Sequence, residues 1–459
     1  MEDRFDDKGL VHDQERLNEL QALPLNQKIG KTISRLTEFI QHFGEDGVYV
    51  SVSGGKDSAV LWDITHKLFP NVPAVFSDTG LEYPEVRDFA KNIATEVVSP
   101  KLSFVEVIRQ YGYAIISKEV SEAIYYARRN RCSQTVNVER ERERESCISK
   151  ETAWKRLELT GNRPPVTRKE YYKMEGVFSS TNVAPPHTVR QHRENDQNYS
   201  EQGATHVRQE NVRRAMLMGS FATSDGKMKS AFNKTKWLPL AQLPFRISNQ
   251  CCTVMKKSPL AIYQRRTKRY PILATMACES RMRQQAWIRT GCNAFEGNHI
   301  SSKPMSFWTE QDVLQYIKTF ELPIAAVYGD IVPVCNTCTD EILQLSFDGM
   351  AEELDKPCEL CTTGANRTGC IWCGFGAHLE KGADRRFLRL KQTHPKLYDY
   401  CMRGGDWFDN PDYIEGLPEY DGEWKNWNPQ KIWMPDKGLG YAKMIDMINE
   451  AYGYEMIAY

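Results

Sequence analysis

The composition of this chain excludes several classes of protein before any motif is considered. Its 459 residues carry 60 basic and 60 acidic side chains, which excludes a globally basic nucleic-acid-binding protein, and the length suits more than one structural unit. No apolar run approaches a membrane span, and residues 1–20 are too charged for a signal peptide, so we expect a cytoplasmic protein with no membrane partner.

The predicted elements follow a polar N-terminal lead-in over residues 1–25, which we expect to be loosely ordered. Hydrophobic spacing predicts a helix over 26–43, a strand over 48–52, a helix over 57–68, a strand over 72–76 and a helix over 84–93. Strands and helices that alternate in this way indicate an α/β fold with a doubly wound parallel sheet. We assign this domain to residues 26–330.

The sequence changes character over residues 128–235, which we interpret as a surface insertion in this domain. Core-like apolar runs are sparse there, and basic side chains outnumber acidic ones. The basic residues include Arg128, Arg129, Arg131, Arg213 and Arg214. A solvated surface excursion and a DNA- or RNA-binding surface are equally consistent with this composition. Residues 331–459 are predicted to form a cysteine-rich, metal-binding C-terminal module with a tryptophan-rich tail.

A glycine-rich segment, residues 53–58 (SGGKDS), lies between the first predicted strand and the helix that follows it. Glycines let the backbone turn sharply and direct several N–H groups toward an anion, and the helix N-terminus adds partial positive charge. Lys56 adds a full positive charge, and the hydroxyls of Ser53 and Ser58 can donate to phosphate oxygens. The segment therefore predicts a pyrophosphate cradle at the carboxyl end of a parallel strand.

The cradle segment resembles the PP-loop of the ATP pyrophosphatase superfamily, and later segments resemble the phosphoadenosine-phosphosulfate-reductase-like family. Residues 77–85 (SDTGLEYPE) resemble the family's D-T-G-x-x-Y/F-P-E stretch, which lies beside the nucleotide. Residues 279–283 (ESRMR) resemble its arginine-bearing loop, and residues 303–313 (KPMSFWTEQDV) resemble its P-x-x-x-W-x-x-x-D-V helix start. The resemblance implies an adenine nucleotide alpha hydrolase-like fold.

The same resemblance implies which residues bind the nucleotide and which are catalytic. The implied binding residues are Ser53, Gly54, Gly55, Lys56, Asp57, Ser58, Asp78, Thr79, Gly80, Arg281 and Arg283. The implied catalytic residues are Lys56, Asp57, Asp78 and Arg281. The ligand is ATP, or a sulfonucleotide (APS or PAPS), and Asp78 is placed to hold Mg²⁺ against the phosphates, because hard cations prefer oxygen ligands.

The chain has 13 cysteines, and in a reducing compartment their CxxC pairs point to metal or redox chemistry. Residues 251–260 (CCTVMKKSPL) resemble the C-C-x-x-x-K-x-x-P-L segment of adenylyl-sulfate reductases, which complete a [4Fe–4S] site with a distant CxxC pair. Residues 367–374 (RTGCIWCG) fit that second half. The resemblance therefore implies a cluster held by Cys251, Cys252, Cys370 and Cys373, since soft thiolates suit iron.

Two further CxxC pairs have the spacing of a structural zinc site. The four cysteines are Cys335, Cys338, Cys358 and Cys361. The intervening residues 339–357 would form the loop of a zinc ribbon. A rival assignment places Cys358 and Cys361 with Cys370 and Cys373 on one metal, and it ranks second because it leaves Cys251 and Cys252 without a role.

Two departures from the family's reductases bear on the reaction. Those enzymes need a mobile C-terminal cysteine, typically in an E-C-G-x-H tail, whereas the last cysteine here is Cys401 and residues 451–459 (AYGYEMIAY) contain none. Sulfonucleotide reductases also often have a degraded phosphate loop, whereas this loop keeps Lys56 and Ser58. The first departure disfavours a reductase, and the second favours a substrate with β- and γ-phosphates.

The first hypothesis is therefore an ATP-dependent sulfur-transfer enzyme that activates its acceptor at the α-phosphate of ATP and releases pyrophosphate. DNA-phosphorothioation and tRNA-thiolation enzymes are the family precedents, which implies a nucleic-acid or nucleotide acceptor and a sulfur-donor protein such as a cysteine desulfurase. Two alternatives stay open. One is a sulfonucleotide reductase that releases sulfite with another thiol, and the other is a nucleotide-sensing or nucleic-acid-binding module whose cluster is structural.

Overall fold

The computed structural model describes residues 12–128, 216–217, 233–297, 299–334, 359–382, 385–416 and 427–459. The chain forms two compact units, and each unit combines two separate stretches of sequence. Unit 1 consists of Met1–Val107 and Cys251–Cys373, and unit 2 consists of Ile108–Gln250 and Gly374–Tyr459. The predicted insertion lies mostly outside the described residues. Within the described parts of the chain, no helix is long and apolar enough to cross a membrane.

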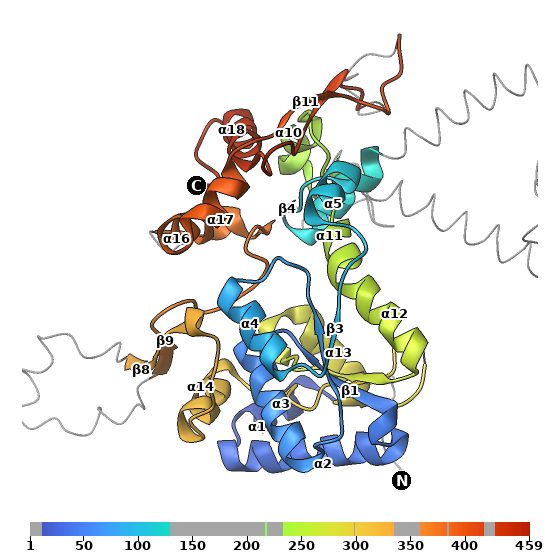
Figure 1. The fold of residues 1–459 in the computed structure, drawn as a ribbon, viewed down its shortest axis with the longest axis vertical. Coiled ribbons are helices and arrows are strands. Elements are labelled where there is room, and N and C mark those ends of the chain that lie inside the picture. Colours follow the sequence, from blue (N-terminus) through green and yellow to red (C-terminus); the bar gives the residue numbers. More distant parts are fainter. Residues whose placement is uncertain are drawn as a thin grey trace, which may run out of the picture. The chain divides into compact units, whose positions relative to one another are not determined.

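Unit 1 contains the α/β domain. Its first stretch holds α1 (Gln14–Gln21), α2 (Leu25–Phe43), β1 (Val48–Val52), α3 (Lys56–Leu68), β2 (Ala74–Ser77), α4 (Pro84–Ile93) and β3 (Glu96–Val98) (Figure 1). Its second stretch holds α12 (Ser258–Thr267), β5 (Tyr270–Ile272), α13 (Arg281–Thr290), β6 (Asn293–Ala294), β7 (Ser301–Ser302), α14 (Glu310–Thr319), β8 (Ile331–Val334) and β9 (Glu359–Thr362). Short α11 (Gln250–Cys252) and a π-helical turn over Thr253–Lys257 lead into α12.

The sheet of unit 1 has the strand order β3-β2-β1-β5-β7-β6. All neighbouring strands are parallel except β6, which pairs antiparallel with β7 at the edge. This sheet confirms the predicted doubly wound α/β fold. The chain winds outward from β1 through β2 in one direction and through β5 in the other, so the carboxyl ends of β1 and β5 form the topological switch point, where open sheets bind ligands.

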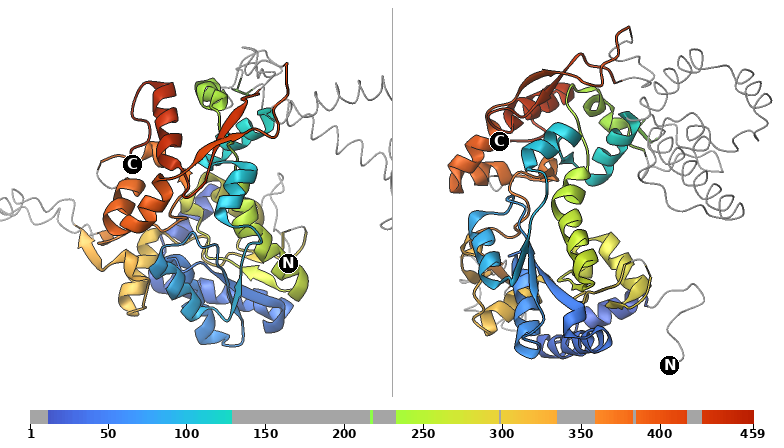
Figure 2. Two further views of the ribbon diagram at one scale, coloured as in Figure 1. Left: turned by 45° about the horizontal axis from the view of Figure 1, so that its top comes forward. Right: turned by 45° about the vertical axis from the view of Figure 1, so that its right-hand side comes forward.

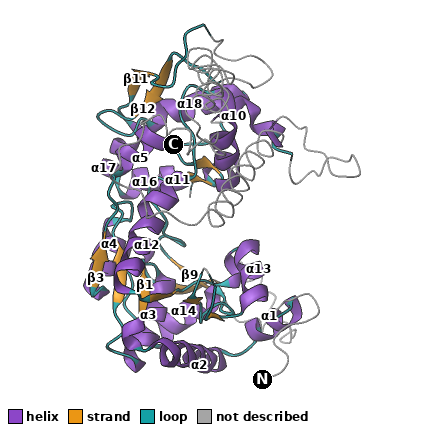
Figure 3. Cartoon of the chain, turned by 90° about the vertical axis from the view of Figure 1, so that its right-hand side faces the viewer, coloured by secondary structure: helices purple, strands orange, loops and turns teal. Residues whose placement is uncertain are grey.

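Helices cover both faces of this sheet because successive side chains of a strand point to opposite faces. On one face Val48, Val50 and Val52 join a core that includes residues of α2, α3 and α14. On the other face Tyr49 packs in a smaller cluster with Tyr263 of α12. Burial on both faces explains why the β1 segment is an apolar run (Figures 2 and 3).

The structure confirms the predicted helices and strands of the first stretch, with two differences. Strand β2 begins at Ala74 rather than at residue 72, because the Val72 N–H closes a turn onto the Phe69 carbonyl and Pro73 has no N–H to donate. The lead-in, expected to be loosely ordered, contains α1, whose Leu17 is 1% exposed. Asp13 caps this helix by accepting from the Arg16 N–H at 2.8 Å.

Unit 2 is built from short elements. They are β4 (Ile115–Ile116), α10 (Leu238–Gln242), β10 (Gly374–Phe375), α16 (Arg386–Thr393), α17 (Pro395–Met402), β11 (Asp406–Asp409), β12 (Lys431–Met434) and α18 (Tyr441–Tyr452). The junction at Val107 falls within α5 (Phe104–Tyr111). The sequence predicts a domain boundary between residues 330 and 331. In the structure, unit 1, which contains the sheet, extends to Cys373.

Candidate nucleotide site

The cradle segment leaves the carboxyl end of β1 and enters α3 at Lys56. Gly54 has a φ of +75°, and a Cβ on it would lie 2.3 Å from the Val86 carbonyl oxygen of α4. Only glycine fits this position, because the backbone is left-handed and α4 approaches it closely. The glycine therefore shapes the turn that brings the α3 N-terminus to the switch point.

The two hydroxyls of the cradle hold the loop in shape in this ligand-free structure. Ser58 Oγ donates to the Gly55 carbonyl at 2.9 Å and accepts from the Ser53 N–H at 3.1 Å. Ser53 Oγ lies 3.1 Å from Ser58 Oγ. Both predicted phosphate donors therefore lie within the turn, where a ligand can exchange for these internal contacts.

Lys56 is the central cation of the site, and its side chain is buried. Its ammonium lies 2.9 Å from Glu310 Oε1 at the start of α14, and it donates to the Asn366 carbonyl at 3.1 Å. The Lys56 N–H also donates to the buried Tyr328 hydroxyl at 3.3 Å. The ammonium is therefore held by Glu310 and Asn366, and the backbone of Lys56 by Tyr328, all of which are distant from it in sequence.

Asp57 completes the charged cluster at this helix start. Burial raises the pKa of its carboxyl above the ordinary value, with the cations of Lys56 and Arg367 opposing that rise. Its Oδ1 is buried and has no hydrogen-bond partner among the described residues, and the Lys56 ammonium lies 3.9 Å away. An unsatisfied buried carboxylate oxygen is costly, and a cation or a donor from a ligand would satisfy it.

Asp78, predicted to hold Mg²⁺, is instead paired with two cations of α4. Both of its carboxylate oxygens bind Arg87, at 2.7 and 2.9 Å, and Lys91 lies 2.9 Å from Oδ2. Burial opposes ionisation, but the bonds from Arg87 and Lys91 outweigh it and hold the pKa of Asp78 below its ordinary value. In this structure Asp78 anchors α4 to the end of β2. The neighbouring Thr79 donates to Glu82 at 2.7 Å, and Gly80 has a φ of +70°.

The two predicted arginines of α13 differ in placement. Arg281 is exposed at the first position of the helix. Arg283 forms an ion pair with Glu279, and burial followed by the nearby Arg367 cation lowers the pKa of its guanidinium, while Asp57 acts in the opposite direction. Arg283 is thus the arginine that the structure brings to the charged cluster around Asp57.

Several residues of this site were not predicted from the sequence. No sequence motif singles out Glu310 or Tyr328. Residues 366–368 stand out in the sequence only as neighbours of the CxxC pair. The Tyr328 hydroxyl lies 2.5 Å from Thr368 Oγ1, and Arg367 Nη2 lies 2.7 Å from Glu279 Oε1. The one available signal was the basic residue in R-T-G-C, immediately before a predicted metal ligand.

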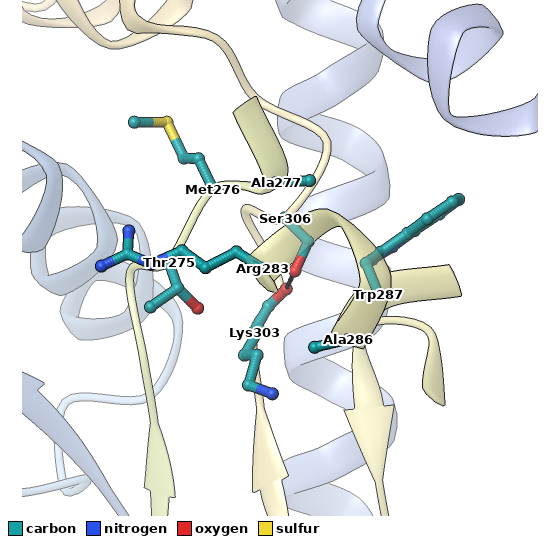
Figure 4. Close-up of a pocket in the computed structure, with 8 residues that line it drawn as sticks. All are labelled: Thr275, Met276, Ala277, Arg283, Ala286, Trp287, Lys303 and Ser306. Carbon is teal, nitrogen blue, oxygen red and sulfur yellow. Dashed lines mark hydrogen bonds between the residues drawn. The ribbon is translucent and has the colours of Figure 1, made fainter. Parts of the chain in front are cut away.

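A small cavity of about 80 Å³ lies beside the charged cluster, past the carboxyl ends of β5 and β7. It is lined by Thr275, Met276, Ala277, Arg283, Ala286, Trp287, Lys303 and Ser306. Figure 4 shows the Arg283 side chain extending toward Thr275, whose hydroxyl is buried without a hydrogen-bond partner among the described residues. Arg283 lines this cavity and also interacts electrostatically with Asp57.

The structure brings together the four cysteines predicted to hold an iron–sulfur cluster. Burial, followed by the neighbouring thiols of Cys370, Cys252 and Cys373, raises the pKa of Cys251. The Lys256 ammonium hydrogen-bonds to Cys370, and the Ile371 N–H donates to the Leu81 carbonyl at 2.8 Å. Electrostatic interactions thus link Cys251 to the other three thiols, and four thiolates are the number that a [4Fe–4S] cluster requires.

The zinc prediction concerns residues that are mostly outside the described part of the chain. Cys335, Cys338 and Cys358 are not described, and only Cys361 is placed, on β9. Among the described residues, no three His, Cys, Asp or Glu side chains are arranged to hold a single metal ion. Thiolates of a cubane cluster bind four different irons, so their arrangement differs from that of ligands to one ion.

Comparisons with known proteins show which family the chain resembles. Residues 47–164 match the family model described as "Phosphoadenosine phosphosulfate reductase domain". The chain is also similar to the adenosine 5'-phosphosulfate reductase of Geobacillus kaustophilus (strain HTA426), with 25% identity over 187 residues that cover 38% of this chain and 72% of that enzyme. The family match includes β1, the cradle and the loop after β2.

Proposed function

Because the chain belongs to a phosphoadenosine phosphosulfate reductase-like family of enzymes, we propose that unit 1 binds an adenine nucleotide at residues 53–58 and catalyses an ATP-dependent sulfur transfer. The proposed acceptor is a nucleic acid or a nucleotide, and the proposed sulfur donor is a protein such as a cysteine desulfurase. The insertion at 128–235 is the proposed contact surface for a nucleic acid.

The observation that carries this proposal is the position of Lys56. Its buried ammonium stands at the N-terminus of α3, at the switch point of the sheet, next to a glycine turn that only glycine can form. A lysine in this position suits the β- and γ-phosphates of ATP, which a substrate such as adenylyl sulfate lacks. Charge neutralisation by the protein is the main requirement of such phosphorus chemistry.

The proposed reaction has two displacements. An acceptor oxygen attacks the α-phosphorus of ATP and pyrophosphate leaves, with Lys56 and the cradle N–H groups stabilising the departing charge. A sulfur nucleophile from the donor then displaces AMP from the activated acceptor. Mg²⁺ would add charge neutralisation when bound, and Asp57, whose Oδ1 lacks a partner among the described residues, is better placed to hold it than Asp78.

An iron–sulfur cluster is part of the proposal, with Cys251, Cys252, Cys370 and Cys373 as its ligands. A bound cluster would supply a site for holding sulfur or electrons. Zinc at Cys335, Cys338, Cys358 and Cys361 is proposed as a structural site.

The second candidate function is reduction of adenylyl sulfate, which the similarity to a bacterial adenosine 5'-phosphosulfate reductase favours. Such a reaction needs a thiol that can reach the nucleotide. Cys401, the last cysteine, is fully buried in unit 2, whereas Cys278 is exposed in unit 1 and interacts with Asp57 and Glu310. Among the described cysteines, Cys278 is the exposed thiol that we propose for this alternative.

One experiment separates the two functions. The anaerobically purified chain is incubated with ATP or with adenylyl sulfate, and released pyrophosphate and sulfite are measured. We expect pyrophosphate from ATP and its loss in Lys56→Ala. Release of sulfite from adenylyl sulfate, with no pyrophosphate from ATP, would replace the proposed function by the second candidate.

A further inference from the structure

We propose that Arg367 binds the distal oxyanion of the adenine nucleotide, which is either the β- and γ-phosphates of ATP or the sulfate of a sulfonucleotide. This inference rests on the proposed function, because it takes the nucleotide site at residues 53–58 as given. It adds a binding residue from a segment far from the PP-loop in sequence. We call residues 363–369 the cap segment.

The cap segment is fixed by backbone hydrogen bonds to Val327 and Tyr328, and the Tyr328 hydroxyl in turn accepts from the Lys56 N–H of the cradle. The Gly364 N–H donates to the Tyr328 carbonyl and the Ala365 N–H donates to the Val327 carbonyl, both at 2.9 Å. From this position the Asn366 carbonyl accepts from the Lys56 ammonium at 3.1 Å. In the ligand-free protein, a backbone oxygen of the cap segment therefore occupies a position on Lys56 that a phosphate oxygen can take.

Arg367 is the next residue, and its guanidinium is held by a shared carboxylate. Its Nη2 lies 2.7 Å from Glu279 Oε1, and the other oxygen of Glu279 pairs with Arg283. The Glu279 side chain is 10% exposed and that of Arg367 is 64% exposed. Two guanidinium groups thus share one buried carboxylate, and the exposed one is free to turn toward an incoming anion.

The charged groups around this pair include cations that can bind an oxyanion. Lys56, Arg283 and Arg367 all interact with Asp57, so three cations converge on the start of α3. In the absence of a ligand they are compensated by Glu279, Glu310 and Asp57. A guanidinium binds a sulfate or phosphate group through two parallel N–H bonds, which is a better match than its single bond to Glu279.

The position of Arg367 also relates the nucleotide to the cysteines. Cys370 follows in the same segment, and the Ile371 N–H is fixed to the Leu81 carbonyl beside the loop after β2. A distal oxyanion held by Arg367 would therefore lie on the segment that carries two of the four proposed cluster ligands. This arrangement directs the phosphate or sulfate end of the nucleotide, rather than its adenine, toward the segment that carries the cysteines.

The test is calorimetric titration of the full chain with ATP, adenylyl sulfate and AMP. We compare wild type with Arg367→Ala, Arg367→Lys and the control Arg289→Ala, which changes an exposed arginine of α13. Arg367→Ala should weaken binding of the nucleotide that carries the distal group about 10- to 100-fold, which is the contribution of a charge-assisted contact. The same substitution should weaken AMP binding by less than about threefold. Arg367→Lys should show an intermediate loss of affinity, because lysine keeps the positive charge but lacks the planar set of N–H donors of a guanidinium.

Comparing ATP with adenylyl sulfate identifies the oxyanion that Arg367 binds. Only the natural substrate should show the full loss of affinity in Arg367→Ala. Equal losses for AMP and for the nucleotide with the distal group, or a lower melting temperature that accounts for the loss, would give Arg367 a structural role and overturn the inference. Unchanged binding in Arg367→Ala would overturn it while leaving the proposed function intact. Absence of nucleotide binding by wild type would overturn both.

Discussion

The Lys56 ammonium lies 2.9 Å from Glu310 Oε1, so the cation of the cradle is already paired before a nucleotide arrives. The lysine side chain is 5% exposed and the glutamate side chain 49% exposed. Burying an unpaired ammonium is unfavourable, and Glu310 therefore stabilises the buried Lys56. A phosphate that binds Lys56 must compete with this carboxylate.

Glu310→Gln should consequently bind ATP more tightly in the absence of Mg²⁺. The expected gain is about three- to tenfold, the size of a partly screened ion pair that the ligand no longer has to displace. Calorimetry at low salt measures it, and Glu321→Gln, an exposed change near the end of α14, serves as the control. Weaker binding in Glu310→Gln would mean that the carboxylate orients Lys56 for the ligand instead.

Gly54→Ala and Gly80→Ala form a matched pair of substitutions. Both glycines have a positive φ, +75° and +70°, but a Cβ at Gly54 would lie 2.3 Å from the Val86 carbonyl, whereas a Cβ at Gly80 would meet nothing within 4 Å. Gly80→Ala should cost about 1–2 kcal/mol of backbone strain, and Gly54→Ala should cost more and abolish nucleotide binding. Denaturant unfolding and calorimetry measure both effects. Equal losses of stability would show that α4 gives way at Gly54.

Asp57→Asn should stabilise the protein at neutral pH. Burial raises the pKa of Asp57 in the folded state above its unfolded value, so the unfolded chain releases this proton more readily. The free energy of unfolding therefore falls as the pH rises through the folded pKa. Wild type and Asp57→Asn should therefore differ most at pH 7, and the difference should shrink toward acidic pH. Urea unfolding from pH 7 down to the ordinary aspartate pKa of 3.8 measures it, with the exposed Asp88→Asn as control. A gap that widens on acidification would refute the assignment.

Cys278 should report nucleotide binding through its reaction with maleimide. Cys278 is an exposed residue. Partial burial of its thiol, together with the carboxylates of Asp57 and Glu310, raises the pKa of that thiol. Labelling at pH 8 should slow several-fold with ATP, because the ligand covers the same cluster of charges. Peptide mass mapping distinguishes this site from Cys292, which should label slowly with and without ATP. Unchanged labelling of Cys278 at saturating ATP would place the nucleotide elsewhere.

Cys251→Ser and Cys373→Ser should each remove most of the iron from anaerobically purified protein. Wild type is expected to be brown with about four irons per chain, because each of four thiolates binds one iron. Cys278→Ser, which changes an exposed cysteine outside the proposed ligand set, should keep both colour and iron. Iron content unaffected by either ligand substitution would exclude the cluster at these cysteines.

The cradle and the sheet were predictable because their signals are local. Strand β1 is a run of apolar residues, the glycine turn follows it directly, and Pro84 stands at the first turn of α4. The partners of Lys56 were not predictable, since Asn366 lies 310 positions away and acts through a backbone carbonyl that any residue possesses. Asp78 shows the converse. Its motif singled out the loop after β2, but the pairing of Asp78 with Arg87 and Lys91 depends on how α4 packs.

The discontinuity of unit 1 has a consequence for the order in which the protein is made. Strands β1, β2 and β3 leave the ribosome first, whereas β5, α14 and the cap segment follow only after the whole stretch Ile108–Gln250. At typical elongation rates of about 5–20 residues per second, β1 waits roughly 10–45 s for its neighbour β5. During that interval a buried central strand is an exposed edge, which is a template for wrong pairing. The nascent chain is therefore most in need of a chaperone between the synthesis of β3 and that of β5.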